Sequence, residues 1–149
     1  MSGTYDLRRF LRFAKRQLRL LDWNISVRWL QESEYEKFAN PPGENPTPSK
    51  ACTDTCDSAI DERRTDIRLL AGACHDQQEA ENVLTHELLH LVLWHANNNR
   101  WRDTRLLEQA IVTLEEPVAN GIRVAMKRHD SCKSSSDSRV EPTPEAKAA

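Results

Sequence analysis

The sequence has no continuous apolar run of about 18 residues, the length that a helix needs to cross a bilayer. Its N-terminus also lacks the pattern of a signal peptide, in which positive charges precede an apolar stretch. Neither sign of charge dominates, because the formal net charge is -2 with 30% charged residues. Composition alone therefore gives no argument for a nucleic-acid or membrane partner. Together these absences predict a cytoplasmic protein with no membrane partner.

Cysteine is scarce as well, with only Cys52, Cys56, Cys74 and Cys132. The four could form two disulfides, but without an export signal we expect free thiols. A structural zinc held by the first three cysteines and His75 is the alternative, although this loose spacing lacks the second ligand turn of zinc fingers. At 149 residues the chain predicts one domain with a modest core, and any cleft in it must be shallow.

The most informative segment is 83–93, VLTHELLHLVL, which carries a His-Glu-x-x-His pattern inside an apolar run. On a helix, His86 and His90 lie one turn apart on the same side, so both imidazoles can reach one metal ion. Glu87 lies between them in angle, which places its carboxylate beside the metal, where it could take a proton from bound water. A buried helix with three ionisable groups is costly unless they are paired or metal-bound. The apolar flanks therefore favour a metal site over a chance arrangement of core histidines.

A protein metal site needs at least one more ligand. His95 is nearest, but it points about 180° away from His86 on a continuous helix, and no Gly or Pro breaks that helix. Glu115 and Glu116 on the following helix are better candidates. Helical phase places Glu115 nearer the buried stripe, but Pro117 weakens this argument because it removes a backbone donor and can kink the helix.

Residues 85–91, THELLHL, resemble the active-site helix of zincin metallopeptidases. The resemblance is strongest to small, single-domain metallopeptidase-like proteins of phages and prophages, which would place the chain in a host cytoplasm. It covers about residues 5–128, but its specificity depends on this helix. It implies Zn2+ as the cofactor, His86 and His90 as ligands, Glu87 as the general base, and a peptide or protein as the substrate.

The gluzincin branch of this family takes its third ligand as a Glu from a second helix, often with an Asp four residues later. Glu116 followed by Asn120 matches that offset, and Glu115 followed by Ala119 does not. The resemblance therefore implies Glu116 as the third zinc ligand, with Glu115 as the alternative. Three protein ligands leave the fourth zinc position open to water, which is typical of a catalytic site. A zinc metallopeptidase is the predicted function.

Two other functions stay open. One is a catalytically silent, zinc-stabilised binding or regulatory module. The other is a DNA-associated protein that uses residues 6–21, an amphipathic helix by its apolar spacing. Its polar faces carry six positive charges with no acid among them: Arg8, Arg9, Arg12, Lys15, Arg16 and Arg19. A solvated basic face is the favoured interpretation, because no aromatic interleaving or helix-turn-helix signature follows.

The remaining segments predict an α+β fold. Residues 23–30 alternate strictly and predict a half-buried strand, with Trp23, Ile25, Val27 and Trp29 in the core. Further strands are predicted at 51–60 and 65–70. A proline-rich loop is predicted at 40–49, before these two strands. In zincins an extended peptide commonly pairs with the sheet edge beside the active-site helix, and residues 51–60 and 67–70 both remain candidates for that edge.

Helix boundaries follow from local signals. Asp76 and Glu79 approximate a capping box, which predicts that the histidine helix begins near Gln77, and it should end at about His95. The next helix should run from Asp103 to about residue 127, and the Ser-, Pro- and charge-rich residues 131–149 predict a disordered tail. The predicted fold is thus a small zincin-like domain, residues 1–130, with a twisted mixed sheet packed on the histidine helix and flanking helices.

Overall fold

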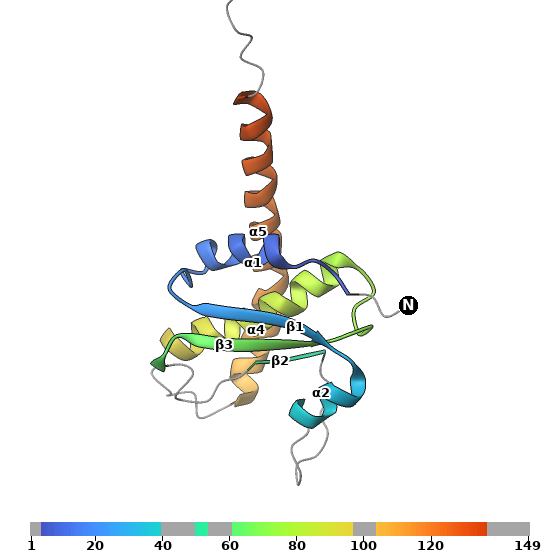
Figure 1. The fold of residues 1–149 in the computed structure, drawn as a ribbon. Coiled ribbons are helices and arrows are strands. Elements are labelled where there is room, and N and C mark those ends of the chain that lie inside the picture. The colour runs from blue at the N-terminus through green and yellow to red at the C-terminus, as the bar shows by residue number, and fades with distance from the viewer. Residues whose placement is uncertain (1–3, 40–49, 54–60, 97–103, 137–149) are drawn as a thin grey trace, which may run out of the picture.

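The structure, a computed structural model, describes residues 4–39, 50–53, 61–96 and 104–136. These residues form four helices and a three-stranded mixed sheet, with the helices packed on the sheet (Figure 1). The predicted α+β class is therefore confirmed. Within the described ranges no helix is both long and apolar enough to cross a membrane. The predicted proline-rich loop at 40–49 lies outside the described residues.

The sheet consists of β1 (Asn24–Leu30), β2 (Ala51–Thr53) and β3 (Arg64–Leu70) in the order β1-β3-β2. β3 is central and pairs in parallel with β1 and antiparallel with β2. Both sides of β3 are thus occupied by neighbouring strands, and β2 stands at an edge. Of the two segments that sequence left as candidates for the edge beside the histidine helix, only 51–60 contributes an edge strand to the described sheet, through residues 51–53; residues 54–60 lie outside the described residues.

The two faces of the sheet differ in polarity, as the alternation in β1 predicted. Ile25, Val27 and Trp29 pack against the core, and their neighbours on β3, Ile67 and Leu69, are fully buried. Trp23, just before β1, is also buried. The prediction that these alternating residues belong to the core is confirmed.

The opposite face carries a polar cluster around Asp66. This carboxylate accepts hydrogen bonds from Ser26 Oγ at 2.6 Å and from the Arg28 guanidinium, and it forms an ion pair with Arg68. Burial acts to raise the pKa of Asp66, but the bonds from Arg28 and Ser26 outweigh it and lower that pKa below its usual value. The ionised carboxylate is therefore the form that the fold stabilises.

The central helix is α4 (Gln77–Ala96), which begins where the capping signal predicted. Asp76 Oδ1 accepts the N–H of Glu79 at 2.7 Å, and Glu79 Oε2 accepts the N–H of His75 at 2.7 Å. The first bond satisfies a backbone donor that the first turn of a helix leaves without a partner, and the second joins the chain before the helix to that turn. Fully buried leucines along α4 join the main core, and Leu89 packs with Leu107 and Ile111 of the last helix. Because α4 is covered on two sides, its apolar run is not confined to one stripe.

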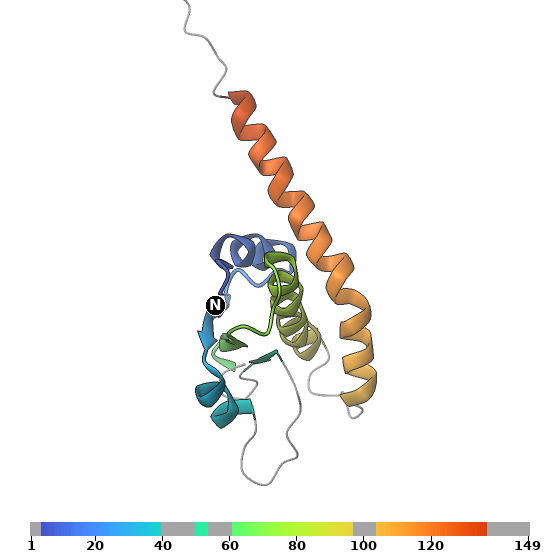
Figure 2. The same ribbon diagram turned by 90° about the vertical axis from the view of Figure 1, so that its right-hand side faces the viewer.

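The other helices are α1 (Arg8–Gln17), α2 (Glu32–Ala39) and α5 (Thr104–Ser136). α1 buries Phe10 and Ala14 and turns its basic residues outward, which confirms its predicted amphipathic character. α5 lies along α4 and then along α1, and its C-terminal part projects beyond the body of the molecule (Figure 2).

α5 is longer than predicted. Residues 131–136, which sequence assigned to a disordered tail, form its last turns, and the rest of that tail lies outside the described residues. The serine hydroxyls in this segment bond back to the helix, Ser131 Oγ to the carbonyl of Lys127 at 3.1 Å and Ser134 Oγ to the carbonyl of Ser131 at 2.9 Å. No Pro or Gly interrupts residues 122–136, so the helix continues past its last core contacts, those of Ile122 and Met126.

Arg123 on α5 forms several hydrogen bonds with α4. Arg123 donates from Nε to Glu81 Oε2 at 2.7 Å, and its Nη2 donates to the carbonyl of Gln78 at 3.0 Å and to Oδ1 of Asn82 at 2.5 Å. The Glu81 side chain is only 10% exposed and the Arg123 side chain 18%. This partly buried network fixes the position of α5 along α4, on which the site described next depends.

Candidate metal site

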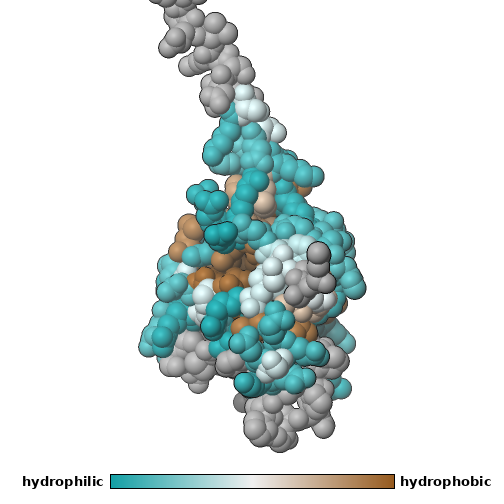
Figure 3. Space-filling view, turned by 45° about the vertical axis from the view of Figure 1, so that its right-hand side comes forward, coloured by the Kyte–Doolittle hydropathy of each residue, from teal (hydrophilic) through white to brown (hydrophobic). Residues whose placement is uncertain are grey.

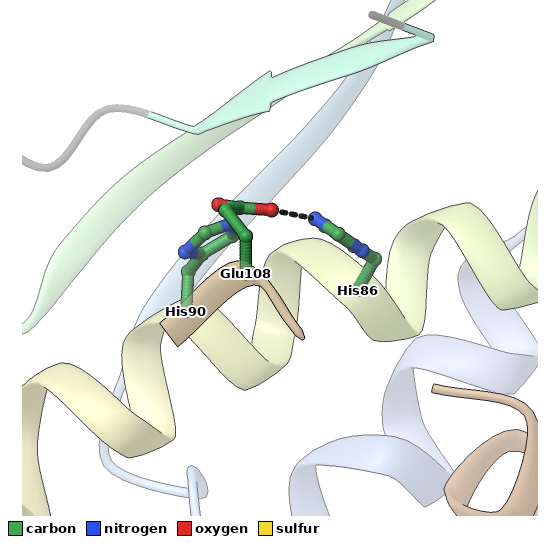
Figure 4. Close-up of side chains that lie close together, drawn as sticks. All are labelled: His86, His90 and Glu108. Atoms are coloured by element: carbon green, nitrogen blue, oxygen red, sulfur yellow. Dashed lines mark ion pairs between the residues drawn. The ribbon is translucent and has the colours of Figure 1, made fainter. Parts of the chain in front are cut away.

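Three side chains from α4 and α5 converge on one point. His86 and His90 project from the same side of α4, and the carboxylate of Glu108 reaches them from α5 (Figure 4). Oε2 of Glu108 lies 3.3 Å from Nε2 of His86, and Oε1 lies 3.1 Å from Nε2 of His90. One ligand atom from each residue can be chosen so that all three lie within 4.8 Å of one another.

These separations fit a bound metal ion. Zinc lies about 2.0 to 2.1 Å from nitrogen and oxygen ligands in tetrahedral sites, so two such ligands stand roughly 3.3 Å apart. The two nitrogen–oxygen separations, 3.3 and 3.1 Å, are close to that value, although they involve different oxygens of Glu108; with one atom from each residue, the three atoms lie within 4.8 Å of one another. Imidazole and carboxylate are also a common ligand combination for divalent transition metals. His86, His90 and Glu108 therefore form a group that could hold a metal ion.

A second acid fixes the orientation of His86. Oε2 of Glu115 lies 2.8 Å from Nδ1 of His86, on the side of the ring away from Glu108. If Nδ1 carries the proton and donates it to Glu115, a neutral His86 turns the lone pair of Nε2 toward the Glu108 carboxylate. Two lone pairs facing each other at 3.3 Å repel, unless a cation lies between them or His86 is itself protonated. A carboxylate behind the ligand imidazole is the usual arrangement in metal sites.

Burial favours the metal-binding form of His90. The pKa of His90 is lowered, chiefly because burial disfavours the imidazolium; Glu108 opposes this effect and His86 adds to it. The neutral imidazole is the form that ligates metals. The environment of His90 therefore suits a ligand better than a cation.

Glu87 points from α4 toward the edge of the sheet. It is only 7% exposed, and its Oε2 accepts a hydrogen bond from the hydroxyl of Thr53 on β2. Burial raises the pKa of Glu87, and the Thr53 bond and His86 act in the opposite direction. The predicted proton acceptor is thus held between the histidine pair and the edge strand β2, in a buried environment where a carboxylate binds a proton more readily than in water.

The predicted residues divide into those that the structure brings together and those that it does not. His86 and His90 lie together and Glu87 lies beside them, as the helical spacing indicated. Glu116, predicted as the third ligand, is exposed, and no contact joins it to either histidine in the part of the chain that the structure describes. Its place in the group is taken by Glu108. The His95 side chain lies outside the described residues.

Helical phase explains both outcomes on α5. The helix continues through Pro117, so the phase argument that this proline weakened still applies. Glu115 faces α4 and Glu116 faces solvent, as that argument indicated. Glu108 precedes Glu115 by two helical turns and therefore lies on the same face. The sequence-based prediction missed Glu108. The signal that could have pointed to it is a second acid seven residues before Glu115, on the helix that follows the histidine pair.

The alternative structural zinc at the cysteines gains no support from the described residues. Cys52 is half-buried and Cys74 is buried, and both are free thiols, as is the exposed Cys132. Burial raises the pKa of both Cys52 and Cys74, which favours the neutral thiol over the metal-binding thiolate. Cys56 lies outside the described residues.

Comparisons of this chain with protein-family models, with curated proteins and with solved structures found no match.

Proposed function

We propose that this protein is a zinc-dependent peptidase of the zincin type, in which His86, His90 and Glu108 bind Zn2+ and Glu87 is the general base. The observation that carries the proposal is the approach of both histidine Nε2 atoms to one carboxylate, at 3.3 and 3.1 Å, beside a buried glutamate on the same helix. The likeness of residues 85–91 to the zincin active-site helix supports the same assignment.

The donor set favours zinc and an open site. Two imidazoles and one carboxylate suit zinc, and three protein ligands leave one coordination position for water or substrate. When bound, zinc lowers the pKa of water toward neutrality and polarises a carbonyl oxygen. Glu115 would keep Nε2 of His86 directed at the ion through its bond to Nδ1.

Glu87 would move the proton. Its Oε2 accepts a hydrogen bond from the Thr53 hydroxyl, so Oε1 would be the oxygen that takes a proton from the attacking water. The same carboxyl group would then pass the proton to the amine that leaves when the peptide bond breaks. Thr53 would fix the carboxylate in the orientation that this transfer needs.

The substrate class follows from the edge strand. β2 is at an edge of the sheet, and the Thr53–Glu87 bond places it directly beside the histidine helix. An extended peptide could add to this edge by main-chain hydrogen bonds and so lie across the site. We therefore propose a peptide or an unfolded protein segment as the substrate.

The test begins with metal content and ends with catalysis. We expect about one zinc per chain by elemental analysis, lost in His86→Ala, strongly reduced in Glu108→Gln and unchanged in Glu116→Gln. Glu87→Gln is the matched variant for catalysis, since it should keep the zinc but lower peptide hydrolysis about 100- to 10,000-fold, the usual contribution of general acid–base catalysis. Absence of zinc after reconstitution would refute the site. Bound zinc without hydrolysis of any peptide in a mixed library would refute the peptidase and leave a zinc-stabilised binding module.

A further inference from the structure

A basic groove lies between α1 and the projecting part of α5, away from the histidine pair. Its volume is about 290 Å³. Figure 3 shows mostly hydrophilic residues, with small apolar patches among them, where α5 leaves the body. On α5 the groove begins at His129, 21 residues after Glu108, which is about 32 Å along the helix axis. It is therefore a separate surface, which the proposed peptidase site does not use.

The charge of the groove is strongly one-sided. Four permanent cations line it, Arg9, Arg12, Arg16 and Lys133, against one carboxylate, that of Asp130. Arg9 on α1 and Asp130 on α5 form an ion pair across the groove, with 2.5 Å between Nη2 and Oδ1. Arg12 and Arg16 are exposed, and neither has an acidic partner among the residues that the structure describes.

This concentration of charge contrasts with the chain as a whole, whose formal net charge is -2. The basic residues on α1 extend from Arg8 to Arg16, a length of about 12 Å along the helix, and Arg19 follows in the turn after it. Arg8 and Arg9 are paired with Asp6 and Asp130, so the charge available to a ligand is mainly that of Arg12 and Arg16. A locally positive surface on an otherwise slightly acidic protein attracts a polyanion. Arginine is the cation best suited to phosphate, because its planar guanidinium can donate two parallel hydrogen bonds.

We propose that this groove binds the phosphate backbone of double-stranded DNA without sequence preference. Single strands fit less well, because they bind by stacking bases on exposed aromatic rings. The aromatic ring in the groove, Phe13, already has the Arg16 guanidinium 6.0 Å from its centroid and the His129 ring against it edge-on at 5.4 Å. An anionic membrane also fits less well, because α1 buries its apolar face, Phe10 and Ala14, in the core and has none left to insert.

The test measures binding of a fluorescein-labelled duplex of random sequence by anisotropy, with EDTA present so that the metal site has no part in it. The affinity should fall with salt, with a log–log slope of about -0.9 for each phosphate contact. Removing two contacts with Arg12→Ala and Arg16→Ala should lower the slope by about 1.8. At 0.1 M salt this corresponds to about eightfold per contact, or roughly 60-fold weaker binding for the pair.

Two further variants separate charge in the groove from charge elsewhere and from loss of structure. The matched control, Lys37→Ala with Arg64→Ala, removes the same charge from exposed positions on α2 and at the start of β3 and should change affinity less than twofold. Asp130→Asn releases Arg9 and should tighten binding, by up to about eightfold for one added contact. A gain of affinity cannot result from unfolding.

Three results would overturn the proposal. One is the absence of an anisotropy change at 50 mM salt when the protein concentration is about 100-fold above a Kd of about 1 μM. Another is an equal loss of affinity in the groove pair and in the control pair. The third is competition by polyglutamate as strong as that by unlabelled duplex at equal charge, which would indicate an acidic protein as the partner. Binding that persists in His86→Ala would support the groove even where the zinc site fails.

Discussion

Glu115 and Glu116 are adjacent acids with opposite orientations, and the same substitution in each tests the geometry of the metal site. Oε2 of Glu115 lies 2.8 Å from Nδ1 of His86, and the two side chains are 29% and 21% exposed. Glu116 faces solvent. We therefore expect Glu115→Gln and Glu115→Ala to weaken zinc binding and the corresponding changes at Glu116 to have no effect.

The size of the effect follows from the bond that is lost. Removing a carboxylate that orients a ligand imidazole typically weakens metal binding 10- to 100-fold. In free energy this is about 1.4 to 2.7 kcal/mol. Gln keeps an oxygen that can accept the Nδ1 hydrogen, so Glu115→Gln should be near the tenfold end. Ala keeps none, so Glu115→Ala should approach 100-fold.

The assay is competition for zinc against a chelator of known affinity, at constant pH and with circular dichroism to confirm the fold. Glu108→Gln should weaken binding more than either Glu115 variant, because it removes a ligand and not the partner of one. Glu116→Gln and Glu116→Ala should stay within twofold of the parent. If a Glu116 variant loses more affinity than its Glu115 counterpart, α5 is rotated differently in the metal-bound protein, and the assignment of Glu108 is wrong.

Three further predictions concern the fold that holds the site. Arg123→Ala should lower the free energy of unfolding in urea by about 3 to 5 kcal/mol, because it leaves the buried carboxylate of Glu81 without its ion-pair partner and with only the hydrogen bond from Gln77; the exposed Arg128→Ala should change it by less than about 0.5 kcal/mol. Leu88→Ala, at a fully buried position on α4, should cost about 2 to 5 kcal/mol, against little for Leu114→Ala, which is 41% exposed. The pKa of Asp66 is lowered in the fold, so its stabilisation is complete above the unfolded pKa and is lost as pH falls through the folded one. Between pH 2 and 6 the free energy of unfolding in urea should therefore fall less with acidification in Asp66→Asn than in the parent. An equal fall in both proteins would contradict the prediction that the Asp66 carboxylate is stabilised by its hydrogen bonds.

The sequence by itself determined the features that depend on neighbouring residues. The histidine helix begins after Asp76, as the capping signal indicated, because a cap needs only residues three positions apart. His86 and His90 face the same way because helical periodicity fixes the angle between residues four apart. The strict alternation of β1 likewise identified its buried face.

Tertiary structure decided which acid meets the histidines. Phase along α5 separates the direction of Glu115 from that of Glu116, but it does not say which turn of α5 lies against which turn of α4. That depends on the offset between the two helices along their axes. Contacts between residues far apart in sequence fix this offset, such as those of Arg123 with Glu81 and of Leu107 with Leu89. Glu108 joins the site through this packing.

The sheet edge and the basic groove required the tertiary structure for the same reason. Both candidate segments predicted strands, but only strand order shows that β3 is central and that β2 lies beside Glu87. The charges of α1 are visible in the sequence, whereas the second wall of the groove comes from residues more than 100 positions later on α5. Local patterns fix helices, strands and their faces; the free energy of packing between distant segments determines which faces meet.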